Sequence, residues 1–237
     1  STNKLSTRVK TIDFPDFIYN NRKFKVELDV IDIQMIYNSR LKDFKKEPVV
    51  INTADFGLNG TFYINGTAIF SGEGTIKERL EYLIHKGFEI GNHTYDHRNL
   101  VDLSESDINE QIGNLDRSVK NATGEESTVI RPPYGAYDEK VMGILQKPVI
   151  LWDVDSEDWE SRNAQTICTK VLSEVKDGDI ILMHDLYETT AEAVELMLPK
   201  LKEQGYQIVT VSEMAEYKGR ELELGKAYGK VSKSDEQ

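Results

Sequence analysis

The sequence has little cysteine, little histidine and no long apolar run. One cysteine and four histidines occur in 237 residues. A lone Cys168 excludes an intramolecular disulfide and a cysteine-based zinc cluster. No stretch approaches the roughly 18 consecutive apolar residues of a membrane-spanning helix, so the sequence predicts no such helix. The chain also lacks internal repeats and Pro/Gly/Ser-rich linkers, which favours a single domain over 1–237.

Basic charge is scarce as well. The 29 Lys and Arg residues stand against 41 Asp and Glu residues, and the net charge is −12. Because an acidic surface repels phosphate backbones, we expect no nucleic-acid partner. Hydrophobic residues make up 39% of the chain, which is enough apolar surface for a core and excludes general disorder.

Short apolar runs alternate with amphipathic segments along the chain. The predicted strands are Phe24–Val30, Thr61–Ile64, Phe88–Gly91, Thr128–Ile130, Val149–Trp152, Asp179–Met183 and Gln207–Val211. Helical patterns lie between them, and one begins at Ser104, which forms a capping pattern with Asp107. This alternation is typical of parallel strands joined by helical crossovers, and about seven such units favour an α/β barrel over an open sheet.

The two ends of the chain differ from this pattern. Residues 1–23 precede the first predicted strand and form an N-terminal extension. Residues 218–237 are charged and contain few apolar side chains, so we expect a flexible tail.

Polar residues cluster directly after four of the predicted strands. In parallel α/β folds, functional groups gather at the carboxyl ends of the strands. Three of the four histidines, His93, His97 and His184, fall at this end. His85 lies in a helical pattern, where a solvated or packing role is the default.

His93 and His97 form an HxxxH pair. One helical turn between them would place both imidazoles on the same face. Two imidazoles, a carboxylate and an open water position together make a divalent metal site, with zinc the first choice. Such a pair also occurs in surface loops without a metal, but its position among other polar strand ends favours the metal. A third ligand is required.

Four ordered motifs resemble those of the polysaccharide deacetylase family. They are HTYDH at 93–97, RPPYG at 131–135, DSEDW at 155–159 and LMH at 182–184. This is the NodB-homology group, carbohydrate esterase family 4, which includes chitin and peptidoglycan N-acetylglucosamine deacetylases. The segment 60–66 is similar to the family's second strand, and the likeness extends from Thr61 to Tyr217.

The resemblance implies a distorted (β/α) barrel of about seven parallel strands and a divalent metal, zinc first, held by one aspartate and two histidines. His93 and His97 match the two histidine ligands. His184 matches the general acid that protonates the leaving amine, and Asp155 matches the carboxylate that tunes this acid.

Four further residues match family positions around the substrate. Arg131 matches the residue that orients the catalytic base, and the backbone amide of Tyr134 matches a group that holds the oxyanion. Leu182 and Trp159 match the lining of the acetyl pocket and groove. Each also has a structural interpretation: Trp159 and Leu182 fit a core, and Arg131 fits a buried ion pair.

The family's first motif, Thr-Phe-Asp-Asp-Gly, is absent. Its first aspartate is the catalytic base and its second is the third metal ligand. The segment Thr53–Gly57 offers Asp55 as the base but has Phe56 at the ligand position. The segment Val26–Asp32 instead offers Asp32 as the ligand but has Ile31 at the base position.

Chain geometry favours the Asp32 alignment. Only three residues separate Gly57 from Thr61, whereas parallel neighbours need a crossover of about a dozen residues. The segment 24–30 followed by an amphipathic stretch fits a first strand and its crossover helix better. Asp55 remains the candidate base, from the long segment after that helix.

Two functions therefore remain open. The first is metal-dependent deacetylation of N-acetylglucosamine polymers, chitin or peptidoglycan glycan, by a monomer that is secreted or associated with the cell wall, although no secretory signal opens the sequence. The second is a degenerate family member with a cell-wall binding or structural role, because one acid of the expected pair is missing. Losing a general base typically costs about 10²–10⁴ in rate.

Overall fold

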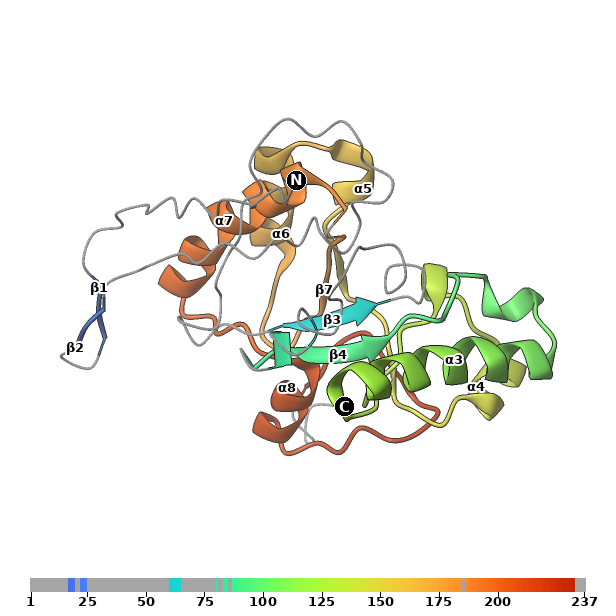
Figure 1. The fold of residues 1–237 in the computed structure, drawn as a ribbon. Helices are drawn as coiled ribbons and strands as arrows, with labels where there is room; N and C mark the ends of the chain where they lie inside the picture. Colours follow the sequence, from blue (N-terminus) through green and yellow to red (C-terminus); the bar gives the residue numbers. More distant parts are fainter. Residues whose placement is uncertain are drawn as a thin grey trace, which may run out of the picture.

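The computed structural model describes residues 17–19, 22–24, 60–64, 80, 83–84, 87–184 and 186–232 (Figure 1). The strands are β1 Phe17–Tyr19, β2 Arg22–Phe24, β3 Thr61–Ile64, β4 Glu89–Asn92, β5 Val149–Ile150, β6 Val154–Asp155, β7 Ile181–Leu182 and β8 Ala227–Tyr228. The α-helices are α3 Glu105–Thr123, α4 Glu139–Ile144, α5 Asp158–Ser161, α6 Ala164–Glu174, α7 Glu188–Glu203 and α8 Val211–Tyr217. Two 3₁₀ turns cover Leu100–Asp102 and Pro133–Gly135.

Most of the strand pairings are parallel. Strand β3 pairs with β4, and parallel bridges then join Asn92 to Ile130 and Ile130 to Val149. Strand β5 pairs in parallel with β8, which extends the row, and β6 pairs in parallel with β7. Strands β1 and β2 form an antiparallel pair. The predicted mixture of parallel strands and helices is confirmed, while the described residues do not close into a barrel.

Helix α3 is positioned by its caps and its apolar stripe. Ser104 accepts a hydrogen bond from the Asp107 amide at the N-terminus, as the sequence predicts, and Gly124 ends the helix at φ 85°. The buried side chains of Leu115 and Val119 pack against Ile90 of β4. Figure 1 shows α3 lying alongside β4. The helix therefore covers the strand that leads into the HxxxH motif.

A second apolar cluster lies between α6 and α7. Cys168 and Val171 of α6 pack with Met197 and Leu201 of α7, and Val154 of β6 joins them. The two helices lie side by side at the top of Figure 1. Cys168 is fully buried there and serves as a small apolar side chain.

Two expectations about the C-terminal part differ from the structure. The predicted strand over Gln207–Val211 is wrong, because Thr210 forms a capping box with Glu213 and starts α8 instead. The segment expected to be a flexible tail contains strand β8, which pairs with β5. The side chains of Tyr228 and Val231 are buried in an apolar cluster, at 7% and 2% exposed, and they hold this charged segment against the core.

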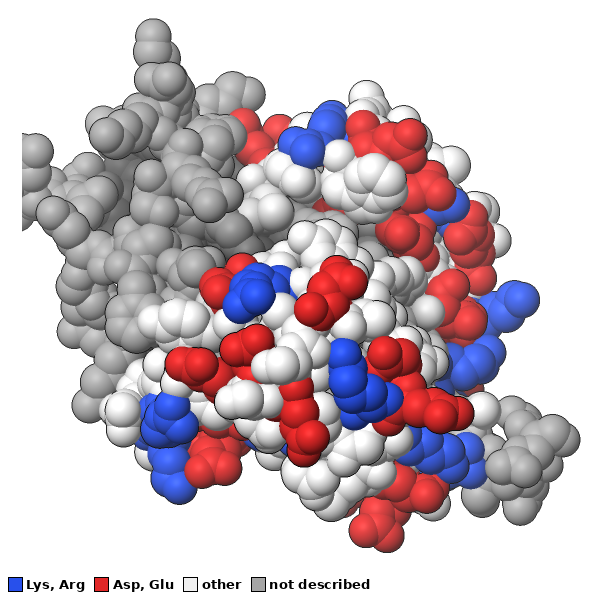
Figure 2. Space-filling view, turned by 90° about the vertical axis from the view of Figure 1, so that its right-hand side faces the viewer, with Lys and Arg blue, Asp and Glu red and all other residues white. Residues whose placement is uncertain are grey.

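The surface carries charges of both signs. Figure 2 shows a face on which Asp and Glu are scattered among Lys and Arg, and on that face the basic side chains do not gather into one patch. Among the described helices, none is long and apolar enough to span a membrane.

The space beside Gly91 predicts an effect on stability. A Cβ at Gly91 would collide with the ring of Tyr63, and Arg131 stacks on that ring at 4.0 Å from its centroid. Because the ring is confined, we expect Gly91→Ala to lower the free energy of unfolding by about 1–3 kcal/mol. Urea unfolding measures this change.

Gly143→Ala is the matched control, since nothing lies within 4 Å of a Cβ in this helical position. We expect it to be neutral or to stabilise the protein by up to about 1 kcal/mol. Equal destabilisation by both substitutions would contradict the packing argument.

Candidate active site

The loop after β4 carries the HxxxH motif in a strained, hydrogen-bonded turn. Thr94 and His97 have φ values of 67° and 60°, a left-handed conformation that costs non-glycine residues roughly 1–2 kcal/mol each. The Thr94 amide donates to Asn92 Oδ1 at 2.8 Å, and the His97 amide donates to Thr94 Oγ1 at 3.2 Å. The two imidazoles thus meet across a turn, whereas we expected a helical turn.

The two rings face each other through their Nε2 atoms. His93 Nε2 lies 3.1 Å from His97 Nε2. His93 Nδ1 lies 2.6 Å from the Arg131 carbonyl oxygen, which only accepts, so we assign the Nδ1 proton to this contact. In the neutral ring, His93 Nε2 then presents a lone pair. Because Zn–N bonds are about 2.0–2.1 Å, tetrahedral zinc separates two ligand nitrogens by about 3.3–3.4 Å, which is close to the observed spacing.

The third ligand does not lie within the described residues. In that part of the chain, no group of three His, Cys, Asp or Glu side chains is arranged to hold a metal ion. The candidates Asp32 and Asp55 both lie outside the described residues. Among the described residues, the two imidazoles of His93 and His97 are donors that fit a divalent metal.

Burial and neighbouring charges keep the histidine pair neutral. Burial is the main cause that lowers the pKa of His93 to about 3, and the charges of His97, Arg131 and His184 lower it further, against the hydrogen bond to Arg131. Burial also lowers the pKa of His97, and the charge of His184 acts in the same direction. His184 therefore lies within electrostatic range of both rings, so the three imidazoles share one region.

Arg131 is a buried cation beneath this region. Its Nε donates to the Ile150 carbonyl at 3.2 Å, and Nη2 donates to the Leu151 carbonyl at 3.0 Å. The guanidinium stacks on Tyr63, and burial lowers its pKa. No carboxylate among the described residues forms an ion pair with Arg131, although a buried charge normally requires such a partner.

His184 follows β7 and is held by Asp158. His184 Nδ1 lies 2.8 Å from Asp158 Oδ1, and the His184 amide donates to Oδ2 at 2.6 Å. The hydroxyl of Thr190 donates to the same Oδ2 at 2.8 Å. Burial tends to raise the pKa of this fully buried carboxyl, but the hydrogen bonds from His184 and Thr190 outweigh it, and the net pKa is lowered. Asp158 therefore stays ionised and fixes the ring.

This arrangement corrects our expectation for Asp155. Asp155 Oδ1 accepts from the Glu157 amide at 2.9 Å, which is a local turn contact, and Asp158 takes the place beside His184. Sequence reasoning missed Asp158 because residues 153–159 contain three aspartates, and no periodicity distinguishes them. The only available signal was its place immediately before Trp159.

The three predicted substrate-binding residues differ in exposure. Tyr134 has φ 61°, is 70% exposed and places its ring edge-on to His97, with 5.0 Å between centroids. Trp159 is 47% exposed on α5, so it is not a core residue, whereas Leu182 is buried in β7. Tyr134 is the one that directly borders the histidine pair.

Comparison with known proteins identifies the family. Residues 51–148 match the family model "Polysaccharide deacetylase". A solved structure described as T48 deacetylase with substrate has a TM-score of 0.70 and 31% identity, covering 75% of this chain and 86% of that chain. The chain belongs to the polysaccharide deacetylase family. Peptidoglycan deacetylase PdaC from Bacillus subtilis aligns with a TM-score of 0.67 and 35% identity, over 71% of this chain and 81% of that chain.

Other members of the family to which the chain is similar include a longer protein and one described as a pseudoenzyme. Peptidoglycan-N-acetylglucosamine deacetylase PgdA from Listeria monocytogenes is 38% identical over 182 residues, which is 76% of this chain and 38% of PgdA. The chain thus spans well under half of that relative. BA3943 from Bacillus anthracis, described as a carbohydrate esterase family 4 pseudoenzyme, aligns with a TM-score of 0.64 and 26% identity, over 75% and 62% of the two chains. Fold alone therefore does not establish activity.

The lowered pKa of His93 predicts a pH-dependent stability of the metal-free protein. The folded value is about 3 and the unfolded value is near 6.5, so between them the unfolded chain binds the additional proton. Stability from this group is present above pH 6.5 and is lost as the pH falls toward 3, by up to about 1.4 kcal/mol per pH unit.

Urea unfolding with a chelator at pH 7 and pH 5 tests this expectation. His93→Asn keeps a donor for the Arg131 carbonyl but cannot titrate, so its loss of stability between the two pH values is smaller than that of the parent chain. An identical loss in both proteins would show that His93 does not titrate as inferred.

Proposed function

We propose that this chain is a metal-dependent deacetylase that hydrolyses N-acetyl groups on N-acetylglucosamine polymers, chitin or peptidoglycan glycan. One observation supports this proposal most strongly. The Nε2 atoms of His93 and His97 lie 3.1 Å apart, close enough to His184 for its charge to act on both rings. The relatives named peptidoglycan deacetylases make peptidoglycan the first substrate to test. Because the chain spans only part of the length of PgdA, its substrate is part of this proposal.

Amide hydrolysis needs an activated water, stabilisation of the developing oxyanion and a proton for the departing nitrogen. His93 and His97 would hold the divalent ion, and zinc suits two imidazoles and a carboxylate. A bound divalent ion supplies Lewis-acid polarisation of the acetyl carbonyl. We assign the backbone amide of Tyr134 as the second oxyanion donor, since this residue borders His97.

His184 is the proposed general acid. With Nδ1–H donating to Asp158, the ring is held in one orientation and Nε2 is left to carry the proton to the leaving amine. The carboxylate of Asp158 stabilises the imidazolium form, and Thr190 keeps this carboxylate in place.

We propose Asp55 as the general base and Asp32 as the third metal ligand. Support for Asp55 comes from Arg131, a buried cation that lacks a carboxylate partner among the described residues. Trp159 is assigned to the substrate groove and Leu182 to the acetyl pocket, next to the loop that carries His184.

The remaining assignments follow from the family and the substrate. We propose a single domain whose parallel strands belong to a distorted (β/α) barrel of about seven strands. We also propose that the protein is a monomer and does not bind nucleic acid. We propose that it acts outside the cell or at the cell wall, because the named relatives act on peptidoglycan.

A second candidate is a binding or structural role without turnover. Two observations favour it: the Asp-Asp motif is incomplete, with Phe56 or Ile31 in place of one acid, and a solved relative is a pseudoenzyme. Measured turnover excludes this role.

Acetate release tests the proposed function directly. Chitooligosaccharides and peptidoglycan are incubated with the protein and Zn²⁺ or Co²⁺, and we expect release that a chelator and His184→Ala both abolish. Absence of acetate with every metal and both polymers would instead favour the binding role.

The Asp158–His184 contact predicts different effects for two aspartates. Asp158→Asn removes the charge that holds the ring, so we expect kcat to fall by about 10²–10⁴ with little change in KM. Asp155→Asn keeps an acceptor for the Glu157 amide, and we expect its kcat to fall far less. Acetate-release kinetics of both variants provide the measurement, and the reverse order would restore Asp155 as the partner.

A further inference from the structure

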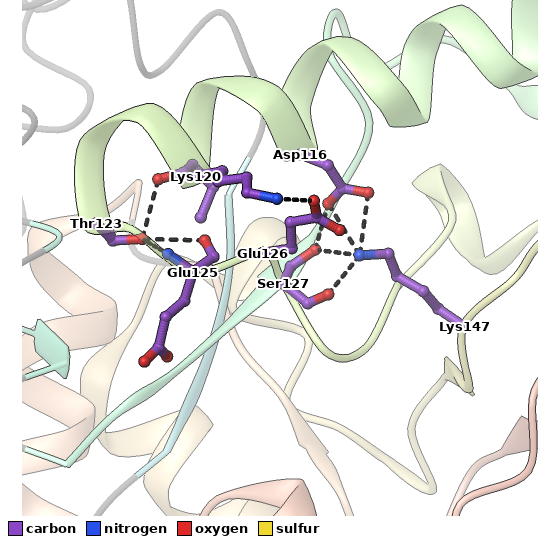
Figure 3. Close-up of polar contacts among 8 residues, drawn as sticks. Asp116, Lys120, Thr123, Glu125, Glu126, Ser127 and Lys147 are labelled. Carbon is purple, nitrogen blue, oxygen red and sulfur yellow. Dashed lines mark hydrogen bonds and ion pairs between the residues drawn. The ribbon is translucent and has the colours of Figure 1, made fainter.

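A partly buried ion pair joins helix α3 to the segment that follows α4. Lys147 Nζ lies 3.0 Å from Asp116 Oδ2, and each side chain is only 14% exposed. Lys147 also donates to Ser127, and Ser127 Oγ donates to Asp116 Oδ1 at 2.6 Å. Figure 3 shows Lys147 and Ser127 converging on Asp116 of α3. The pair therefore joins α3 to the segments that precede and follow α4.

Asn92 connects this ion pair to the loop that carries His93 and His97. The fully buried Asn92 side chain donates from Nδ2 to Asp116 Oδ1 at 3.0 Å and to the Ile112 carbonyl at 3.1 Å. Both contacts are to acceptors, so they fix which end of the amide points toward α3. Asn92 Oδ1 is thereby turned toward the loop, where it accepts from the Thr94 amide at 2.8 Å.

The connection continues to the ligand His97. Thr94 Oγ1 accepts from the His97 amide at 3.2 Å, and both residues hold left-handed backbone conformations. Such conformations persist only where surrounding contacts hold them. An unbroken series of hydrogen bonds thus leads from Lys147 and Asp116 through Asn92 and Thr94 to the turn that sets the ring spacing.

We propose that Asp116 and Lys147 are positioning residues that hold the His93–His97 turn in its metal-binding geometry. This inference rests on the proposed function for its metal. Asn92, Ser127 and Lys147 all donate to Asp116 Oδ1, and Lys147 Nζ also lies 3.0 Å from Oδ2. An amide at this position keeps one acceptor oxygen, but it directs an N–H toward Lys147 and removes the charge that holds this cation. Asp116 Oδ1 then loses its fixed position, and the side chain of Asn92 that bonds to it is held less firmly.

Outer contacts of this kind typically change metal affinity about 10–100-fold. We therefore expect Asp116→Asn to raise the Kd for Co²⁺ by about tenfold or more, measured by calorimetry on the full chain. In the metal-free protein, hydrogen exchange of the segment 92–98 is expected to accelerate. Lys147→Met removes the cation and its hydrogen bonds to Ser127 but leaves the Asp116 acceptor for Asn92. We expect it to raise the Kd for Co²⁺ and to accelerate the exchange of 92–98 by smaller amounts.

An exposed ion pair between α3 and the segment that follows it supplies a matched control. Lys120 and Glu126 form a pair at 2.8 Å with exposed fractions of 58% and 55%, one turn beyond Asp116 (Figure 3). Lys120→Met is expected to leave both the Co²⁺ affinity and the exchange of 92–98 unchanged.

A folded Asp116→Asn or Lys147→Met protein with parental Co²⁺ affinity and parental exchange of 92–98 overturns the proposal. If Asp116→Asn fails to fold, the Lys147→Met protein tests the proposal in its place. If the parent chain binds no Co²⁺, the hydrogen exchange of 92–98 in the parent and the variants tests it. A parent chain that binds Co²⁺, loses affinity on substitution and releases no acetate refutes the deacetylase function and supports the positioning role.

Discussion

The site depends on the parallel pairing between the end of β4 and the segment around Ile130. The Asn92 amide donates to the Val129 carbonyl at 2.9 Å, and the Arg131 amide donates to the Asn92 carbonyl at 2.9 Å. These two bonds place His93 beside Arg131, so the imidazole reaches the Arg131 carbonyl. Without this register, the tautomer of His93 and the approach of His97 would both be undetermined.

Two buried charges, Asp158 and Arg131, lie beside the histidines and have different hydrogen-bond partners. Asp158 is satisfied by three hydrogen bonds, two from His184 and one from Thr190, and is thereby kept ionised in a buried position. Arg131 is held by two carbonyl oxygens and an aromatic ring. A negative charge lies next to His184, whereas burial and a positive charge near His93 keep the ring of His93 neutral.

Local signals in the sequence carried much of the prediction. The Ser104 cap and strand Thr61–Ile64 were predicted correctly because they depend on neighbouring residues. Strand β8 was missed because its pairing with β5 joins segments far apart in the chain. The choice between Asp155 and Asp158 likewise depends on which carboxylate the turn after β6 buries, and this is a tertiary property.

The number of imidazoles bound to the metal tests the central claim most directly. X-ray absorption spectroscopy of the zinc-loaded protein counts nitrogen and oxygen ligands and detects imidazole scattering. The account predicts two imidazoles at about 2.0–2.1 Å together with oxygen ligands, with His184 remaining outside the coordination shell. A site with no imidazole, or a third one that disappears in His184→Ala, would contradict the separation of metal ligands from the proton donor.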